Sequence, residues 1–353
     1  MSVAALQLPA NLALSSLSAP RQDFIRSLPK AELHAHLNGC IPLRCLQELY
    51  RERAASSTSP LPEDDVIKKG LDLLERGAML NDINDFFVIF PKTIYALTSN
   101  IPAISRATSA VLESFLSPGV TAPEDPPQCA YLELRTTPRR TPTRREYLCA
   151  VLDEVEKYAA SQAALIVSVD RRMAMEDLDE CVDLAIVLKQ EGRRVVGLDV
   201  CGDPSQGDMA TFAPALNRAK ASGLALTLHI AEIPEYPTSD VAALLSTRPA
   251  RLGHATFLDP EAQELVRRDK TVIEICLSSN LLCNSTTSLD AHHIQYYLEH
   301  DHPIAISTDD TLVFRNTLAG EYALLLAQPP LGLGLSEAEV ARVAAMSMDA
   351  RFL

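Results

Sequence analysis

AELHAHLNG, residues 31–39, places His34 and His36 in the first segment of the chain that has the composition of a β-strand. Side chains alternate between the two faces of a strand, so residues i and i+2 share a face about 7 Å apart. We therefore expect both imidazoles to point the same way. A lone histidine here would be interpreted as a core residue, but imidazole is the commonest neutral metal ligand, and two can share one ion. A metal site requires further ligands elsewhere in the chain.

Seven further short apolar runs follow this segment, separated by amphipathic stretches at helical spacing. Such alternation predicts parallel strands joined by crossover helices. Eight strands with intervening helices favour a single closed (β/α)8 barrel of the TIM type over an open sheet. The predicted strands are residues 31–37, 129–137, 164–170, 195–203, 224–232, 251–257, 271–280 and 303–310.

The segments between these strands predict the rest of the organisation. Residues 41–120 have helical periodicity and predict a long helical insertion after the first strand, followed by a proline-rich surface loop at 117–128. Residues 144–162 and 175–192 predict helices of the barrel. Residues 29–353 are therefore interpreted as one barrel domain. Residues 1–28 are interpreted as an N-terminal tail or extra element, because their apolar stretch lacks the preceding basic residues of a secretory signal.

The net charge of the chain limits the classes of molecule that the protein can bind. The 353 residues include 32 Lys and Arg against 46 Asp and Glu, a formal net charge of −14. A surface of this sign repels nucleic acid polymers and anionic lipid, so we expect a small-molecule partner and no membrane association. Eight cysteines without a CxxC pair indicate reduced thiols. We accordingly expect the protein to be cytoplasmic. We also expect it to be a monomer.

Polar residues recur at the ends of the predicted strands, where the reactive residues of such barrels lie. A polar side chain in a buried strand costs free energy unless it is paired, so any one of them could be structural. Their recurrence favours a common site. These residues are His34, His36, Glu133, Arg135, Asp170, Asp199, Gly202, Asp203, His229, Glu232, His254, Ser278, Ser279, Asn280, Asp309 and Asp310.

Three imidazoles and one carboxylate form a donor set that suits one zinc ion per chain. The set is supplied by His34, His36, His229 and Asp309. Glu232 follows His229 by three residues and can stand beside the metal as an acid, and His254 is left as a proton acceptor near a metal-bound water. Taken singly, each residue could be structural, for example Asp310 as a helix N-cap. Together they favour a hydrolytic metal centre.

Four further histidines fall in DAHHIQYYLEHDHP, residues 290–303, which predicts a helix and its exit. We interpret His292, His293, His300 and His302 as surface residues. The H-x-E and P-C-x-x-C signature of the zinc deaminases that act on flipped bases is absent from the sequence, which excludes their fold.

At these motifs the chain resembles the adenosine deaminase family of metal-dependent barrel hydrolases, from LPKAELHAHLNG at 28–39 to TDD at 308–310. It is most similar to the adenosine deaminase-like branch, the N6-methyl-AMP deaminases. The similarity lies in YLELRTTPRR (131–140), VSVDRR (167–172), GLDVCGDP (197–204), HIAE (229–232), GHATFL (253–258) and CLSSN (276–280). The chain departs from the family pattern at Tyr95, where a histidine is expected, and at Ala255, where glycine is usual.

The resemblance implies zinc-dependent hydrolytic deamination at purine C6, which would convert N6-methyl-AMP to IMP and methylamine. It implies that Glu232 donates a proton to purine N1 and that His254 helps to deprotonate or orient the water. The implied substrate contacts are His36, Asn38, Thr136, Thr137, Pro138, Arg139, Asp170, Gly202 and Asp310. Adenosine or adenine is the alternative substrate. The alternative outside enzymes is a catalytically silent barrel that binds purine nucleotides.

RTTPRRTPTRR, residues 135–145, concentrates arginine within an acidic chain. A guanidinium group matches phosphate oxygens in bidentate fashion, and this loop follows the second strand on the face where substrate enters. We expect Arg139 and Arg140 to grip a 5′-phosphate, with hydroxyl groups from Thr136 and Thr137. Arg144 and Arg145 are interpreted as solvated residues that lead into a helix.

Overall fold

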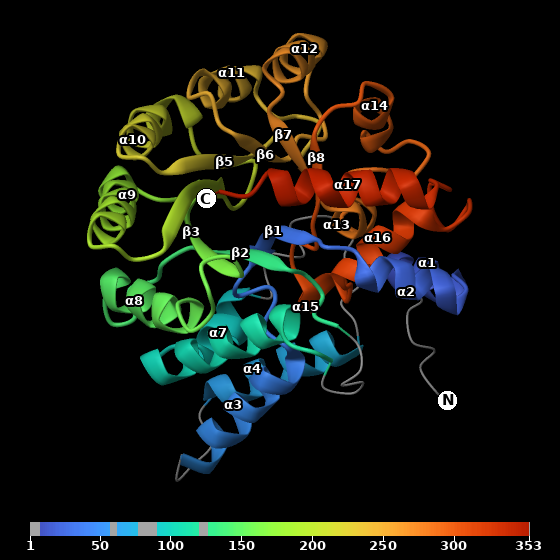
Figure 1. The fold of residues 1–353 in the computed structure, drawn as a ribbon. Helices are drawn as coiled ribbons and strands as arrows, with labels where there is room; N and C mark the ends of the chain where they lie inside the picture. Colours follow the sequence, from blue (N-terminus) through green and yellow to red (C-terminus); the bar gives the residue numbers. More distant parts are fainter. Residues whose placement is uncertain (1–7, 57–61, 77–89, 120–125, 353) are drawn as a thin grey trace.

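The computed structural model describes residues 8–56, 62–76, 90–119 and 126–352. Within these ranges eight parallel strands pair in the order β1 to β8, and a bridge between Ala35 and Asp309 joins the first strand to the end of the last (Figure 1). The predicted (β/α)8 barrel is therefore confirmed. The strands are β1 (Ala31–His36), β2 (Tyr131–Thr136), β3 (Ala163–Asp170), β4 (Val195–Cys201), β5 (Ala225–Ile230), β6 (Arg251–His254), β7 (Val272–Ile275) and β8 (Ile304–Ile306).

Burial on both faces explains the composition of these strands. Parallel barrel strands have side chains toward the interior on one face and toward the helices on the other, so they read as near-continuous apolar runs. All six residues of β2 are buried, including Glu133 and Arg135. The charged residues of the strands thus lie in the interior and need partners there.

A ring of helices covers the outside of the barrel (Figure 1). Several begin at a polar N-cap: Thr143, Asp208 and Asp259 each accept a backbone N–H of the first turn. The helices after β2 are α8 (Arg144–Val155), α9 (Met175–Gln190), α10 (Met209–Ala221), α11 (Thr238–Ser246), α12 (Pro260–Asp269), α13 (Leu277–Leu282), α14 (Ile294–Glu299), α15 (Thr311–Phe314), α16 (Leu318–Leu326) and α17 (Glu337–Asp349).

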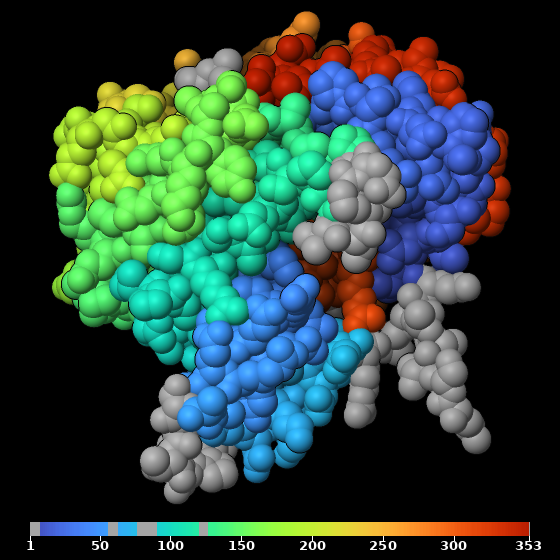
Figure 2. Space-filling view, turned by 60° about the horizontal axis from the view of Figure 1, so that its bottom comes forward, coloured from blue at the N-terminus to red at the C-terminus, as the bar shows by residue number. Residues whose placement is uncertain are grey.

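The described parts of the segment between β1 and β2 are largely helical, as predicted, and form a lobe that projects from the barrel (Figure 2). Its helix α7 packs against α8 and so attaches the lobe to the barrel wall. The proline-rich loop predicted at 117–128 falls partly outside the described residues, at 120–125. The helices of this insertion are α3 (Leu43–Ser56), α4 (Pro62–Arg76), η1 (Phe90–Ile94), α6 (Tyr95–Leu97) and α7 (Ile101–Leu116).

From residue 8 on, two helices precede the barrel, α1 (Pro9–Ser16) and α2 (Ala19–Ser27). Helix α1 packs against α16, with Ala10 and Ala13 buried between them. The contact is close, since a Cβ added at Gly320 of α16 would lie 2.9 Å from the Cβ of Ala10. In the part of the chain that the structure describes, every helix is too short or too polar to cross a membrane.

Candidate active site

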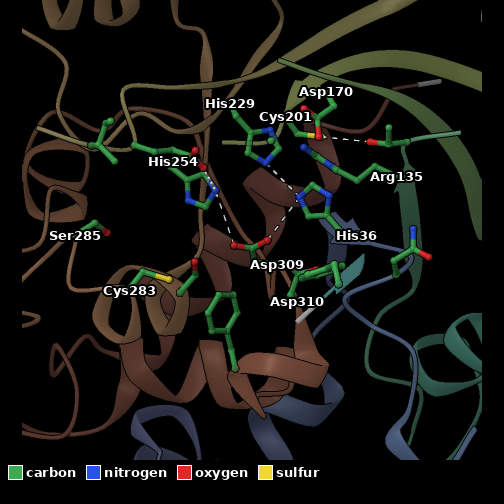
Figure 3. Close-up of a pocket in the computed structure, with 18 of the residues that line it drawn as sticks. His36, Arg135, Asp170, Cys201, His229, His254, Cys283, Ser285, Asp309 and Asp310 are labelled. Carbon is green, nitrogen blue, oxygen red and sulfur yellow. Dashed lines mark hydrogen bonds and ion pairs between the residues drawn. The ribbon is translucent and has the colours of Figure 1, made fainter. Parts of the chain in front are cut away.

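The strand ends on one side of the barrel open into a cavity of about 410 Å³. Figure 3 shows His36 from β1, His229 from β5, His254 from β6 and Asp309 after β8 turned toward one another at its base. The predicted site residues that line the cavity are His36, Asn38, Thr136, Thr137, Asp170, Gly202, His229, Glu232, His254, Asp309 and Asp310.

Three imidazole nitrogens converge at the base of the cavity. The Nε2 atom of His36 lies 3.4 Å from that of His34 and 3.2 Å from that of His229. Asp309 Oδ1 lies 3.6 Å from His36 Nε2 and 3.9 Å from His34 Nε2. Two nitrogen ligands on a tetrahedral zinc ion would stand about 3.3 Å apart, since each Zn–N bond is about 2.05 Å long. The spacing of these side chains therefore fits a single zinc ion.

Two of these imidazoles are held by carboxylates on the side away from the cavity. His34 Nδ1 lies 2.6 Å from Glu274 of β7, and His229 Nδ1 lies 2.9 Å from Asp199 of β4. A carboxylate accepts the Nδ1–H, so each Nε2 presents a lone pair to the other imidazoles. Burial lowers the pKa of His34 well below the usual histidine range, which keeps it neutral. The Nε2 lone pairs of these imidazoles face one another with no hydrogen-bond donor between them, and a bound cation would relieve their repulsion.

The two carboxylates are joined by a buried arginine. Arg135 donates to Glu274 at 2.8 Å and lies 3.5 Å from Asp199. Burial opposes ionisation of Glu274, but Arg135 and Arg251 outweigh it and lower the pKa of this carboxyl to about 2. The three side chains are fully buried, and Arg251 adds a second guanidinium beside Glu274, so each buried carboxylate has a cationic partner and is held in place against its histidine.

Glu232 and His254 form an ion pair beside the histidine cluster. His254 Nε2 lies 3.0 Å from Glu232 Oε1 and 3.8 Å from Asp309 Oδ2. Burial alone would lower the pKa of His254, but Glu232 and Asp309 raise it to about 9. The same pairing overcomes the effect of burial on Glu232 and lowers the pKa of its carboxyl. The pair thus holds one proton, on the imidazole, within hydrogen-bond reach of the carboxylate.

Left-handed backbone at the strand ends aims these side chains inward. His254 has φ +60° and Asp309 has φ +63°, values that are uncommon outside glycine. Gly202 after β4 has φ +97°, and a Cβ there would lie 2.8 Å from the carboxyl group of Asp170. Glycine at this position leaves its backbone accessible from the cavity.

Of the residues expected to bind metal or substrate, His34, Pro138, Arg139 and Arg140 do not line the cavity. His34 is fully buried behind it and takes part through Nε2 alone. Pro138 and Arg139 lie outside the cavity lining. The Arg139 guanidinium donates to the carbonyl of Thr98 at 2.9 Å and to that of Tyr95 at 3.3 Å, and it stacks on the Tyr95 ring. Carbonyls at the end of a short helix lack helical partners and carry partial negative charge, which explains the attraction.

The other arginines of this loop pair with barrel helices. Arg140 is exposed and bonds Asp177 and Glu180 of α9. The prediction that Arg140 faces the substrate is therefore not supported by its position. Arg144 was expected to be solvated, but it is only 6% exposed and pairs with the same two acids. Acidic residues of the following helix attract these guanidinium groups, a contact that the loop sequence alone does not reveal.

Several residues that the sequence reasoning missed line the cavity. Phe90 reaches it from the insertion and Phe314 from α15. Tyr95, which the sequence marked as a departure from the family pattern, also reaches it from the insertion. Arg172, two residues beyond β3, lies on the rim and bonds Asp170 at 2.6 Å. Arg172 stands in the VSVDRR motif directly after a strand end, so that position was the available signal. Phe90 and Phe314 carried no such signal.

Two of the four histidines interpreted as surface residues are buried, His293 is half-buried, and His300 is exposed as expected. His292 is 1% exposed and His302 is 3% exposed. Their burial comes from packing of the segment before and after α14 against the barrel. The residues beside these histidines in the sequence are mostly polar, so the sequence alone does not indicate this packing.

The (β/α)8 fold and the cluster of imidazoles and carboxylates at its strand ends together indicate the class of metal-dependent barrel hydrolases. Residues 29–353 match the family model described as Adenosine deaminase, and the chain belongs to this family. It is 33% identical to the N6-mAMP deaminase of Arabidopsis thaliana over 94% of each chain. The crystal structure of Arabidopsis N6-mAMP deaminase MAPDA superposes with a TM-score of 0.81, covering 94% of this chain and 95% of that one. A structure of Arabidopsis ADAL complexed with IMP gives the same TM-score at 33% identity, covering 94% of each chain.

Proposed function

We propose that this protein is a zinc-dependent purine aminohydrolase that converts N6-methyl-AMP and water to IMP and methylamine. The observation that carries the proposal is the convergence of three imidazole Nε2 atoms and Asp309 beside the Glu232–His254 pair at the base of one cavity. Similarity to N6-methyl-AMP deaminases, and to a relative that was crystallised with IMP, supports the choice of substrate.

The metal ligands in this proposal are His34, His36, His229 and Asp309. When bound, zinc lowers the pKa of water to about 7 and so supplies hydroxide at neutral pH. Glu274 and Asp199 keep the Nδ1 protons of His34 and His229 in place, so the Nε2 lone pairs stay directed at the ion.

Proton transfer is assigned to the Glu232–His254 pair. Glu232 must carry a proton when it meets purine N1, whereas the raised pKa of His254 and the lowered pKa of Glu232 favour the proton on His254 before substrate binds. The 3.0 Å hydrogen bond between them is short enough to pass this proton to the carboxylate. His254, once neutral, can accept the proton of the attacking water. Protonation of N1 makes C6 electrophilic, and the oxygen of the water forms a bond to C6. As the bond from C6 to the exocyclic nitrogen breaks, His254 returns the proton it took from the water to that nitrogen and regains one from the C6 hydroxyl group, so methylamine leaves and the 6-oxo group of IMP remains.

The purine is held by groups deep in the cavity. Asp310 is 3% exposed, and its Oδ1 has no hydrogen-bond partner among the described residues, so it is free to contact a ring nitrogen. The backbone N–H of Gly202 is assigned to the opposite edge of the base. Asn38, Asp170, Thr136 and Thr137 line the path toward the rim and are assigned to the ribose and phosphate. For the phosphate, Arg172 takes the place of Arg139 as the candidate, because the Arg172 guanidinium is exposed on the cavity rim, whereas that of Arg139 donates to the carbonyls of Tyr95 and Thr98.

The state of the cysteines indicates the cellular compartment. All eight are free, and six of them are buried. Unpaired thiols support a reducing compartment such as the cytoplasm.

The experiment that tests this function is product analysis with N6-methyl-AMP, AMP and adenosine under identical conditions. We expect IMP and methylamine from N6-methyl-AMP, at a kcat/KM above those for AMP and adenosine. Adenosine deaminated as efficiently as the monophosphates would favour the adenosine deaminase alternative. Tight binding of all three without any product would favour a silent nucleotide-binding barrel.

A further inference from the structure

Two stacked imidazoles stand behind the wall of the cavity, just before α14. The rings of His292 and His293 have centroids 4.4 Å apart and planes 19° apart. Each directs Nε2 at an oxygen of a residue that lines the cavity. His293 Nε2 lies 2.8 Å from the carbonyl oxygen of His254, and His292 Nε2 lies 3.0 Å from Oδ1 of Asn280.

Both imidazoles act as hydrogen-bond donors at Nε2, because carbonyl and amide oxygens only accept. His292 Nδ1 accepts the backbone N–H of Ile294 at 3.0 Å, which fixes the neutral tautomer with its proton on Nε2. Burial lowers the pKa of His292 to about 2 and that of His293 to about 4. Neither ring therefore competes with His254 for protons at neutral pH.

The His254 carbonyl needs a partner because of where β6 ends. Pairing between β6 and β7 stops at Gly253 and Glu274, one residue earlier. His254 and Ala255 then both adopt left-handed backbone, with φ +60° and +51°. His254 still pairs with Ile230 of β5, but on the β7 side the ladder has ended at this buried residue, and a buried carbonyl without a partner would destabilise this conformation. His293 supplies the missing donor from a segment 39 residues away.

We propose that the His292–His293 pair positions the catalytic groups: His293 holds the left-handed backbone that aims His254 at Glu232, and His292 holds Asn280 in the cavity wall. The proposal rests on the proposed function, since it takes His254 as the group that exchanges protons with Glu232. His293 touches neither substrate nor metal in this assignment, so it is a positioning residue.

A matched control lies at the other end of the same helix. His302 is 3% exposed and lies 2.7 Å, through Nε2, from the carbonyl of Thr271. Its ring contacts Tyr297, as the ring of His293 does. Neither Thr271 nor Tyr297 lines the cavity. His302→Leu therefore removes the same kind of bond from the same part of the fold without touching the site.

The test compares His293→Leu, His293→Gln and His302→Leu in zinc-loaded protein, by kcat and KM for N6-methyl-AMP, metal content and Tm. Misplaced catalytic groups lower turnover, so His293→Leu should reduce kcat roughly 10-fold or more at unchanged KM and metal content. His302→Leu should lower Tm comparably and leave kcat unchanged. Gln can donate from Nε2 near the position of the imidazole Nε2–H, so His293→Gln should recover most of kcat.

A second readout separates this inference from the proposed function. The imidazole NMR signals of His254 in the zinc-loaded protein should shift in His293→Leu and stay in place in His302→Leu, whatever the substrate is. Lack of N6-methyl-AMP turnover by the wild type would overturn the proposed function but leave this comparison standing. Equal kcat and equal His254 signals in His293→Leu and His302→Leu would overturn the positioning role. If His293→Leu folds too poorly for either measurement, His293→Met, which fills a similar volume and has no side-chain N–H donor, takes its place in both comparisons.

Discussion

The floor of the cavity and its rim are built in different ways. On the floor, His34, His229 and their partners Asp199 and Glu274 all come from barrel strands, and a second layer of buried charge fixes each imidazole. On the rim, Phe90 and Tyr95 come from the insertion, and Arg172 from a loop after β3. Strands hold reactive groups to a defined geometry, whereas loops and insertions vary without disturbing the barrel. Substitutions in the floor should therefore change catalysis or metal binding, and those in the rim should change substrate affinity.

The largest effect is expected at Glu232. Glu232→Gln keeps the shape of the side chain but removes the acidic proton, so kcat for N6-methyl-AMP should fall 100-fold or more with zinc content and KM retained. The matched control is Glu235→Gln, which alters an exposed carboxylate that lines the same cavity. Wild-type kcat in Glu232→Gln would remove this residue from proton transfer.

The second effect concerns the layer beneath the metal ligands. Asp199→Asn replaces a group that accepts the Nδ1–H of His229 with one that can also donate, and it removes a charge beside Arg135. We expect zinc affinity to fall about 10- to 100-fold, measured by competition with a chelator. Asp203→Asn, two residues beyond β4, serves as the control. Unchanged affinity in Asp199→Asn would mean that the strands alone orient His229.

The smallest effect is expected on the rim. Arg139 bonds the carbonyls of Tyr95 and Thr98, so Arg139→Ala should loosen the insertion against the cavity. KM should rise about 5-fold, the equivalent of about 1 kcal/mol, for N6-methyl-AMP and for the nucleoside alike. Arg140→Ala, which removes an exposed arginine of the same loop, should change neither value. A rise confined to the nucleotide would instead support the predicted contact between Arg139 and the phosphate.

The difference between a floor built from strands and a rim built from loops and the insertion also explains which features could be predicted from the sequence. Strand alternation and the rule that barrel sites lie at strand ends were enough to bring together His36, His229, Glu232, His254 and Asp309, which come from four strands. These rules act within a few residues, so they need no knowledge of tertiary contacts. The fold followed from the same regular alternation of apolar runs and helices.

The rest depended on contacts between residues far apart in the chain. Glu274 is a single acid within an apolar strand, and its function emerges only from its bonds to His34 and Arg135. From sequence alone, His293 resembles a surface residue. Its function depends on the end of β6, where His254 lies one residue beyond the last pair between β6 and β7. Arg139 looked free for a phosphate because the loop sequence does not show the carbonyls of the insertion beside it.

The most direct measurement of the central claim is turnover of N6-methyl-AMP by protein stripped of metal with a chelator, before and after addition of one molar equivalent of zinc. His36→Ala is treated in the same way. The account predicts that stripped wild-type protein is inactive, that one equivalent of zinc restores activity, and that His36→Ala stays inactive and binds no zinc. Full turnover by metal-free protein, or by His36→Ala, would contradict the assignment of the histidine cluster as a hydrolytic metal centre.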